Sequence, residues 1–215
     1  MLVDELPGDD FELLRGWQAG DEDAGNALFE RHFAGLARFF RNKVGDRFED
    51  LVQKTLLVVL EKRDDFRGDA SFRTYLFSVA HNVLRNEVRA LQRERDRFDP
   101  ASQSVEDLGL TAGSIVDRKR ERQLVLAGLR RIPLDLQVVL ELYYWEQMEG
   151  EEIAAVLGIP HGTVRSRIRR GQEQLRKALG RMKCTKEELE STMTRLDDWA
   201  AQLRAAVVPG EAKPG

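Results

Sequence analysis

This chain has few of the residues that build disulfides, metal sites and membrane spans. Its one cysteine, Cys184, cannot form an internal disulfide, and its three histidines, His32, His81 and His161, lack metal-ligand spacing. No apolar run approaches the roughly 18 residues that span a bilayer, and the acidic N-terminus lacks the basic start and apolar stretch of a secretory signal. We therefore expect a cytoplasmic protein with no metal, no cofactor and no membrane insertion.

Aromatic residues are also scarce, at 7% of the 215 residues, whereas charged residues make up 33%. Strand patterns are almost absent, and Leu, Ala, Arg and Glu recur throughout, which is typical of helical proteins. No paired nucleophile and base or phosphate-binding loop is evident, so we do not expect an enzyme. The predicted fold class is all-α.

The net charge of −3 is unevenly distributed. Residues 1–23 contain eight acidic residues and one arginine, whereas residues 161–183 contain eight basic residues and one glutamate. Because Lys and Arg supply most of the nonspecific affinity for DNA phosphates, the second segment would attract nucleic acid and the first would repel it.

Helical periodicity divides the chain into two small domains, each large enough to bury a core. Residues 8–97 are predicted to form four helices, and residues 117–180 four more with a break at Pro133. Between them, residues 98–116 lose the periodicity and are rich in Pro, Ser and Gly, with acids and no base, which predicts a flexible acidic linker.

Residues 181–215 form a C-terminal extension with one amphipathic helix, opened by a capping box from Thr185 to Glu188. The helix has an apolar stripe that needs a covering surface: Leu189, Met193, Leu196, Ala200 and Leu203. We expect a regulatory role, by masking a domain or binding a regulator. A disordered end and a helix docked on its own domain are the alternatives.

The strongest motif is EGEEIAAVLGIPHGTVRSRIRRGQEQLRKAL, residues 149–179, which has the spacing of a helix-turn-helix. Ala154 is small where two helices approach, and Gly158 can take the left-handed conformation that the tight turn requires. The outward positions can bond phosphates and base edges: Thr163, Arg165, Ser166, Arg169 and Arg170. A solvated basic hairpin is the alternative, but the agreement of small, turn, core and basic positions favours sequence-specific binding to duplex DNA.

The second motif is DDFRGDASFRTYLFSVAHNVLRNEVR, residues 64–89, an aromatic and basic loop followed by an amphipathic helix. Single-stranded bases stack on aromatic rings and bond to amides, which Phe66, Tyr75 and Asn82 could provide. The arginines could follow the backbone: Arg67, Arg73, Arg85 and Arg89. Since aromatic residues at helical spacing are more often core, the segment alone does not distinguish a core from a base platform.

Together, the two motifs make the stretch from Leu13 to Leu179 resemble the extracytoplasmic-function (ECF) branch of the sigma-70 family of RNA polymerase sigma factors. The resemblance is carried by EDLVQKTLLVVLEKRDDFRGDASFRTYLFSVAHN and by IPLDLQVVLELYYWEQMEGEEIAAVLGIPHGTVRSRIRR. It implies that the first domain is sigma region 2, which binds core RNA polymerase and opens the −10 promoter element. The second domain would be sigma region 4, which binds the −35 element. The resemblance thus implies transcription initiation at stress- or signal-responsive promoters.

The resemblance also assigns residues to these roles. The residues implied to read and melt the −10 element are Phe66, Arg67, Arg73, Tyr75, Asn82 and Arg85. Those implied to enter the −35 major groove are Thr163, Arg165, Ser166, Arg169 and Arg170. The implied polymerase-docking residues are Asp50, Leu51, Gln53 and Lys54. Two weak DNA sites on a tether become useful only when polymerase fixes both domains, so the free protein should bind DNA poorly.

Lys54 stands where the family usually has glutamate, and a lysine facing polymerase arginines would weaken docking. One interpretation is that Glu49 and Asp50 suffice and Lys54 is solvated. The other is that phosphorylation of the neighbouring Thr55 restores negative charge and switches the factor on. The expected regulator is accordingly an anti-sigma factor or a Ser/Thr kinase.

Two other functions fit parts of the sequence. A helix-turn-helix repressor or activator would bind duplex DNA as a dimer without polymerase, and a sigma-like decoy would bind an anti-sigma protein without engaging promoters. The intact arginines of residues 165–170 argue against the decoy. A gel shift of duplex DNA without core polymerase would favour the repressor or activator.

Overall fold

The computed structural model describes residues 9–66, 68, 70–93, 101–106, 120–182, 186–196, 198 and 201. Over these residues the regular structure is helical, with one isolated bridge between Ser104 and Pro133 and no strand. The predicted all-α fold class is confirmed.

The first domain contains four helices, as predicted: α1 (Asp10–Gln18), α2 (Glu22–Val44), α3 (Phe48–Glu61) and α4 (Phe72–Arg93). Short 3-10 turns precede and follow α3: η1 (Gly45–Arg47) and η2 (Arg63–Asp65). The first two helices begin after Asp9 and Asp21, whose carboxylates accept backbone N–H bonds at 2.8 and 3.1 Å. Acidic residues in the first turn of both helices also interact favourably with the positive end of the helix dipole.

The second domain also has four helices: α5 (Arg120–Leu129), α6 (Leu134–Leu140), α7 (Gly150–Leu157) and α8 (His161–Gly180). Pro133 immediately precedes α6, where the missing N–H of a proline costs no helical hydrogen bond. A π-helical turn, η3 (Glu141–Trp145), continues from α6. Gly158 ends α7 with φ of 62°, so the tight turn into α8 has the left-handed glycine that the helix-turn-helix pattern predicts.

The C-terminal helix α9 (Lys186–Thr194) docks on the second domain. Leu189 and Met193 pack against the apolar cluster of α5 and α8, and Leu196 just beyond the helix is buried in it. Arg176 of α8 donates a hydrogen bond to Glu190 at 2.6 Å. This is the docked arrangement that the sequence left as an alternative. Thr185, Ala200 and Leu203 lie outside the described residues.

Part of the predicted flexible linker is also docked. Residues 101–106 lie against the turn between α5 and α6, where Val105 is fully buried. The backbone N–H of Leu134 donates to the Gln103 carbonyl at 2.9 Å, and that of Glu106 donates to Arg130 at 3.2 Å. The expected flexibility is therefore wrong for this segment, because a buried side chain and backbone hydrogen bonds fix it. The rest of residues 98–116 lies outside the described residues.

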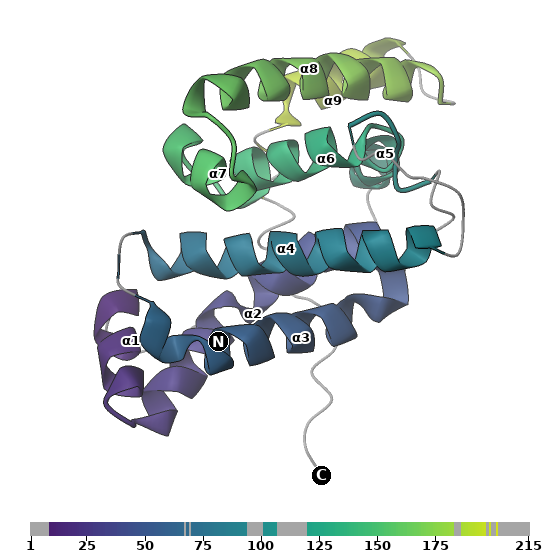
Figure 1. Cartoon of the computed structure of the whole chain (residues 1–215). Coiled ribbons are helices and arrows are strands. Elements are labelled where there is room, and N and C mark those ends of the chain that lie inside the picture. The colour runs from purple at the N-terminus through teal and green to yellow at the C-terminus, as the bar shows by residue number, and fades with distance from the viewer. Residues whose placement is uncertain are drawn as a thin grey trace.

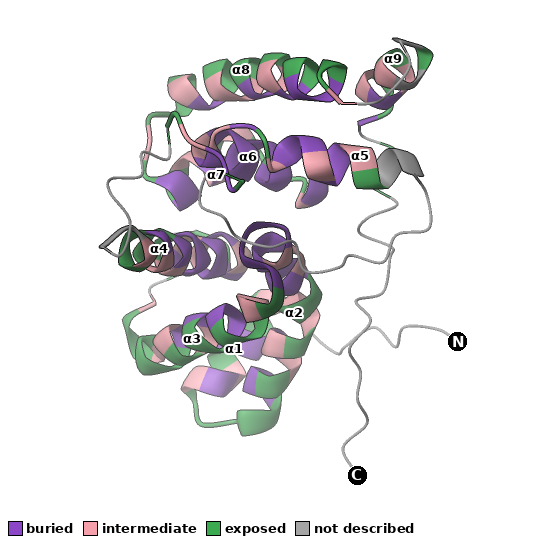
Figure 2. Ribbon diagram, turned by 90° about the vertical axis from the view of Figure 1, so that its right-hand side faces the viewer, coloured by how far each residue is buried: buried purple, intermediate pink, exposed green. Residues whose placement is uncertain are grey.

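The two domains pack directly on each other. Figure 1 shows α4 as a layer between the rest of the first domain and the helices α6 and α7. One apolar cluster runs through this contact and joins Phe77 and Leu84 of α4 to Ile153 and Val156 of α7. Figure 2 shows buried residues along α4 and in the helices that cover it. The described chain thus adopts a closed arrangement in which helices of the second domain cover one side of α4.

Candidate nucleic-acid interface

The second helix of the helix-turn-helix, α8, presents a basic outer surface. Arg165, Ser166, Arg169 and Arg170 are exposed, and Thr163 is half-buried. On the inner side Val164 is buried and Ile168 packs on the core, while Gly171 lies so close to Leu140 that an added Cβ would sit 3.0 Å from its Cγ. This close approach to α6 fixes the side of α8 that faces outward. All five predicted residues therefore share one surface.

A broad hollow of ≈ 850 Å³ follows this surface. Arg165, Arg169 and His161 line it together with Tyr143, whose side chain is partly exposed, and the lining contains no acidic residue. The neighbouring Arg167 instead turns toward the protein, where it pairs with Asp135 at 3.6 Å. The positive charge beside the hollow therefore belongs to the predicted DNA-contacting residues.

The loop before α4 forms an aromatic corner. The rings of Phe66 and Tyr75 lie 4.9 Å apart between centroids, and both side chains are partly exposed. Phe72 is buried behind them, 6.4 Å from Phe66. Burial and the charge of Asp65 raise the pKa of Tyr75, so its hydroxyl stays neutral at pH 7. A neutral phenol beside a second ring suits base stacking with one hydrogen bond.

The remaining residues expected at the −10 element are spread along α4. Asn82 and Arg85 are exposed, and Asn82 lies two turns beyond Tyr75, about 10 Å along the axis. The structure therefore joins Phe66 and Tyr75 directly and leaves Asn82 farther along the same helix. Arg67 lies outside the described residues.

The second domain covers part of the polar side of α4, including Arg73, which was expected to contact the −10 element. Arg73 pairs with Glu146 at 3.8 Å, and the hydroxyl of Thr74, which is buried, donates to Glu152 at 3.1 Å. Glu146 also accepts a hydrogen bond from Arg38 of α2 at 3.3 Å. In this arrangement Arg73 meets a carboxylate where a DNA phosphate was expected.

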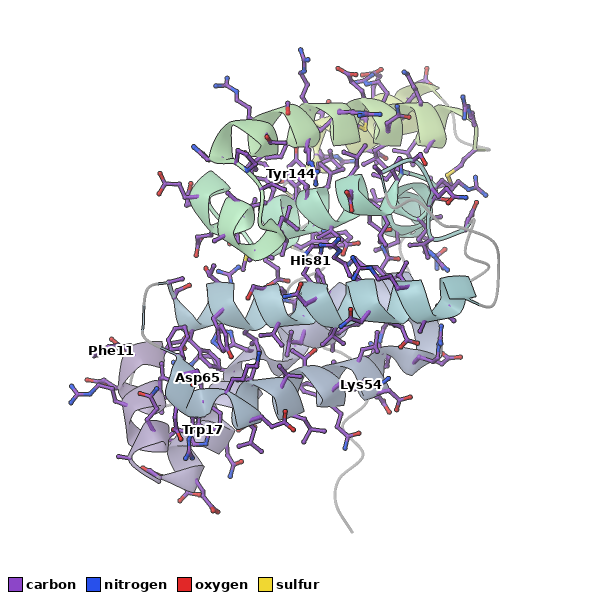
Figure 3. The ribbon with its side chains drawn as sticks, viewed as in Figure 1. Phe11, Trp17, Lys54, Asp65, His81 and Tyr144 are labelled. Atoms are coloured by element: carbon purple, nitrogen blue, oxygen red, sulfur yellow. The ribbon has the colours of Figure 1, made fainter. Side chains whose placement is uncertain are left out.

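His81 lies at the centre of this contact, between α4 and the second domain (Figure 3). It is 7% exposed, and its ring forms a hydrogen bond with the backbone of Val156. Burial, together with the charges of Arg85, Lys43 and Arg167, lowers its pKa from 6.5 to about 4. His81 is thus neutral at pH 7 in the closed arrangement.

A buried ion pair that the sequence did not predict joins the domains, between Lys43 of α2 and Glu141 of η3. Their side chains are 1% and 2% exposed. The Glu141 carboxylate also accepts from Asn42 at 3.2 Å and from Gln137 at 2.8 Å. Burial lowers the pKa of Lys43 and raises that of Glu141, since each loses water around its charge. A lysine in the apolar stripe beside Phe39 was the available signal.

The predicted polymerase-docking residues divide between two sides of α3. Asp50, Gln53 and Lys54 are exposed, and Lys54 lies 3.6 Å from Glu87 of α4. Leu51 is 1% exposed and belongs to the core, so its assignment to a docking surface is wrong. The buried stripe of α3 explains this: position 51 lies one turn before Thr55 and two before Val59, which are also buried.

An apolar groove that the sequence did not predict lies next to these exposed residues. Its volume is ≈ 240 Å³, and its lining includes Glu49 and Gln53 with apolar side chains of α2 and α3. Three of the apolar residues are between 44% and 49% exposed: Phe33, Leu57 and Leu60. Gathered exposed apolar residues are a common feature of protein contact surfaces.

Thr55 does not belong to this surface. Its side chain is 0% exposed, and its hydroxyl donates to the Leu51 carbonyl at 2.7 Å. The expected modification site is therefore inaccessible in this structure, and a phosphate on Thr55 would not lie on the exposed side of α3.

No helix in the described part of the chain could cross a membrane. Across those residues, no cluster of His, Cys, Asp and Glu has the arrangement of a metal site.

Comparison with known proteins identifies both domains. The family model of Sigma-70 region 2 matches residues 28–94, and that of Sigma-70, region 4 matches residues 122–175. The ECF RNA polymerase sigma-E factor of Escherichia coli is 30% identical over 174 residues, 76% of this chain and 90% of that protein. The factor of the same name from Haemophilus influenzae is 28% identical over 176 residues, 77% of this chain and 93% of that protein.

Two solved structures have the same fold. The sigma factor RpoE in complex with the anti-sigma factor NepR from Bartonella quintana matches with a TM-score of 0.57 and 22% identity, over 71% of this chain and 94% of that one. CnrH in complex with the cytosolic domain of CnrY matches with a TM-score of 0.59 and 24% identity, over 80% and 97% of the two chains. With region 2 and region 4 both matched and a sigma-E factor 30% identical over most of its length, this chain belongs to the ECF branch of the sigma-70 family.

Proposed function

We propose that this sigma factor directs core RNA polymerase to promoters with −10 and −35 elements and helps to open the DNA. The observation that carries the proposal is the exposed arginine surface of α8, held outward by the close packing of Gly171 on α6. Arginine is the commonest reader of guanine in the major groove, and it also pairs with phosphates. Arg165 and Arg169 are one helical turn apart, so both can face one groove of a duplex.

The proposed −10 site is the aromatic corner of Phe66 and Tyr75, with Asn82 and Arg85 farther along α4. Two partly exposed rings 4.9 Å apart provide faces on which an unpaired base can stack. The exposed Arg85 would bind phosphates of the opened strand. Arg73 would join this site only after it leaves Glu146.

The proposed polymerase-docking surface combines the exposed Asp50, Gln53 and Lys54 with the groove lined by Phe33, Leu57 and Leu60. An apolar groove with a polar rim is typical of a protein–protein contact. The ion pair of Lys54 with Glu87 supports the interpretation that this lysine is accommodated on the surface of region 2.

For regulation we propose an anti-sigma protein as the partner and the cytoplasm as the site of action. Both solved relatives are complexes, one of RpoE with the anti-sigma factor NepR and the other of CnrH with the cytosolic domain of CnrY. A kinase acting on Thr55 is the weaker proposal, because the hydroxyl is buried. The inducing signal would be a stress or another change of environment.

The test is in vitro transcription with purified core polymerase on genomic fragments, with mapping of the start sites. Arg169→Ala should lower promoter-specific transcripts about tenfold or more, since a good arginine contact to a base contributes about 1–3 kcal/mol. Lys177→Ala is the matched control, because it removes an exposed cation from the same helix two turns away. Specific duplex binding by the protein without core polymerase, and no specific start sites with it, would favour a repressor or activator and contradict the proposal.

A further inference from the structure

We propose that Gln18, the last residue of α1, is a positioning residue for the base-holding corner of region 2. By this proposal its amide fixes the backbone on both sides of η2, and so holds Phe66 in place against Tyr75. The inference rests on the proposed −10 function of these two rings. It assigns a role to α1, which precedes the residues matched by the region 2 family model.

The contacts of Gln18 are directed at one turn of the chain. Its side-chain Nε2 donates to the carbonyl of Arg63 at 3.0 Å and to the carbonyl of Phe66 at 3.3 Å. These two carbonyls belong to Arg63, the first residue of η2, and to Phe66, the residue directly after η2. At Phe66 the backbone becomes extended, with φ of −73° and ψ of 113°, so the helical pattern of hydrogen bonds ends there. A side-chain amide with two N–H groups can satisfy two such carbonyls at once.

Gln18 can act as an anchor because α1 is itself held firmly. The neighbouring Trp17 is 4% exposed and packs edge-on against Phe29 of α2 at 5.0 Å. At the start of α1, Asp10 accepts from Arg31 at 2.9 Å and lies 2.7 Å from the His32 ring. The helix is thus tied to α2 at both ends.

The same end of α1 also contacts a side chain of the turn. The Arg63 guanidinium lies over the Trp17 ring, 5.6 Å from its centroid. Figure 3 shows Trp17 and Asp65 at the same end of the molecule, where α1 meets the end of α3. A rigid helix, one amide and one cation–π contact therefore hold the turn that directly precedes Phe66, whose ring is partly exposed.

The consequence concerns geometry more than stability. A binding group works only when it is held within about 0.5 Å of its productive place. Without the Gln18 donors the two carbonyls can bond to water, so the fold survives, but the position of Phe66 relative to Tyr75 is no longer fixed. Base selectivity should therefore fall more than the affinity for core polymerase or the melting temperature.

The test uses full-length protein with core polymerase and a random pool of 12-nucleotide single-stranded DNA, followed by sequencing of the bound molecules. Gln18→Met keeps the size of the side chain and removes both donors, whereas Gln18→Lys keeps donors that can reach the carbonyls. Gln147→Met makes the same change at an exposed glutamine outside the proposed sites. Core binding and melting temperature are measured for each variant.

We expect Gln18→Met to reduce the enrichment of the preferred base about tenfold, with core binding unchanged and the melting temperature within a few degrees. Gln18→Lys should recover most of the enrichment, and Gln147→Met should match the unaltered protein. Wild-type enrichment in Gln18→Met, or an equal loss of enrichment, core binding and thermal stability, would overturn the positioning role. If the unaltered protein enriches no base, the proposed −10 function fails and not the contact alone.

Discussion

Thr55 and Lys54 are neighbours in the sequence with opposite environments. The Thr55 methyl and hydroxyl fill a buried contact of α3, whereas the Lys54 ammonium is in solvent near Glu87. A charge added at position 55 would enter the core, and a charge added at position 54 would enter water. The two positions therefore separate the effect of charge on docking from its effect on stability.

We predict that Thr55→Glu lowers the free energy of unfolding by about 3 kcal/mol or more, because it buries a carboxylate without a partner. Thr55→Val keeps the shape and should cost about 1 kcal/mol, since only the bond to the Leu51 carbonyl is lost. Both values are measured by urea unfolding.

The control for this prediction is Lys54→Glu, which changes charge at an exposed position and should alter stability by no more than about 0.5 kcal/mol. Equal stabilities of Thr55→Glu and Lys54→Glu would contradict the burial of Thr55. Thr55 would then be accessible to a kinase.

The helices themselves follow closely from the sequence, because their apolar residues recur at helical spacing and their ends carry caps, a proline and a glycine. The amphipathic helix predicted within residues 64–89 is α4, where Leu76, Ala80 and Leu84 recur every four positions and are all at most 1% exposed. The docking of residues 101–106 could not be predicted in this way. One buried valine in a segment rich in Pro, Ser and Gly creates no periodic pattern, and the segment's backbone hydrogen bonds are to residues 24 and 31 positions away.

The tail helix α9 covers apolar surface of region 4, so its removal should weaken that domain. We predict that Leu196→Ala lowers the free energy of unfolding by about 2–3 kcal/mol, because it leaves a cavity beside Val125, Leu129 and Leu175. Asp198→Ala, at an exposed position two residues on, is the control. The measurement is urea unfolding of the full chain, and a Leu196→Ala protein as stable as this control would mean that α9 does not pack on region 4 in solution.

At the scale of the whole molecule, the closed arrangement conflicts with the proposed promoter contacts. The −10 and −35 elements are 25 base pairs apart by their positions, which is about 85 Å along B-form DNA. Regions packed through α4 and α7 cannot reach both, so binding to a promoter requires that this contact opens. In the sequence, Lys43 and Glu141 are single charges next to apolar residues. Their pairing across 98 positions depends on how the domains meet, which local patterns do not contain.

The Lys43–Glu141 pair should control this opening. We predict that Glu141→Ala weakens the closed arrangement by about 3–5 kcal/mol, because the buried Lys43 then loses its carboxylate partner and keeps only the Phe39 carbonyl. The radius of gyration from small-angle X-ray scattering should increase, and DNA binding by the polymerase complex should not decrease.

Replacing both partners separates the charge from the contact. The double variant Lys43→Met with Glu141→Leu should remain as compact as the unaltered protein, since well-packed apolar residues commonly replace a buried ion pair without loss. An expanded double variant together with a compact Glu141→Ala protein would contradict the proposed role of the pair.

His81 makes the closed arrangement sensitive to acid. The pKa of His81 is about 4 when α7 covers it and returns toward 6.5 when the domains separate. Above pH 6.5 the ring is therefore neutral in both states, and its contribution to the stability of the closed arrangement is fully present. As the pH falls from 6.5 toward 4, only the open state takes up the proton, and the closed state loses up to about 3 kcal/mol. Part of this cost is the positive charge that protonation in the closed state would place near Arg85, Lys43 and Arg167. Between pH 7.5 and 5.5 we therefore expect the closed-to-open equilibrium to shift about tenfold toward the open state, seen as an increase in the radius of gyration.

His81→Gln keeps a polar side chain that does not titrate, so subtracting its pH response removes the effect of the carboxylates. Identical curves for the two proteins would exclude His81 as the group responsible.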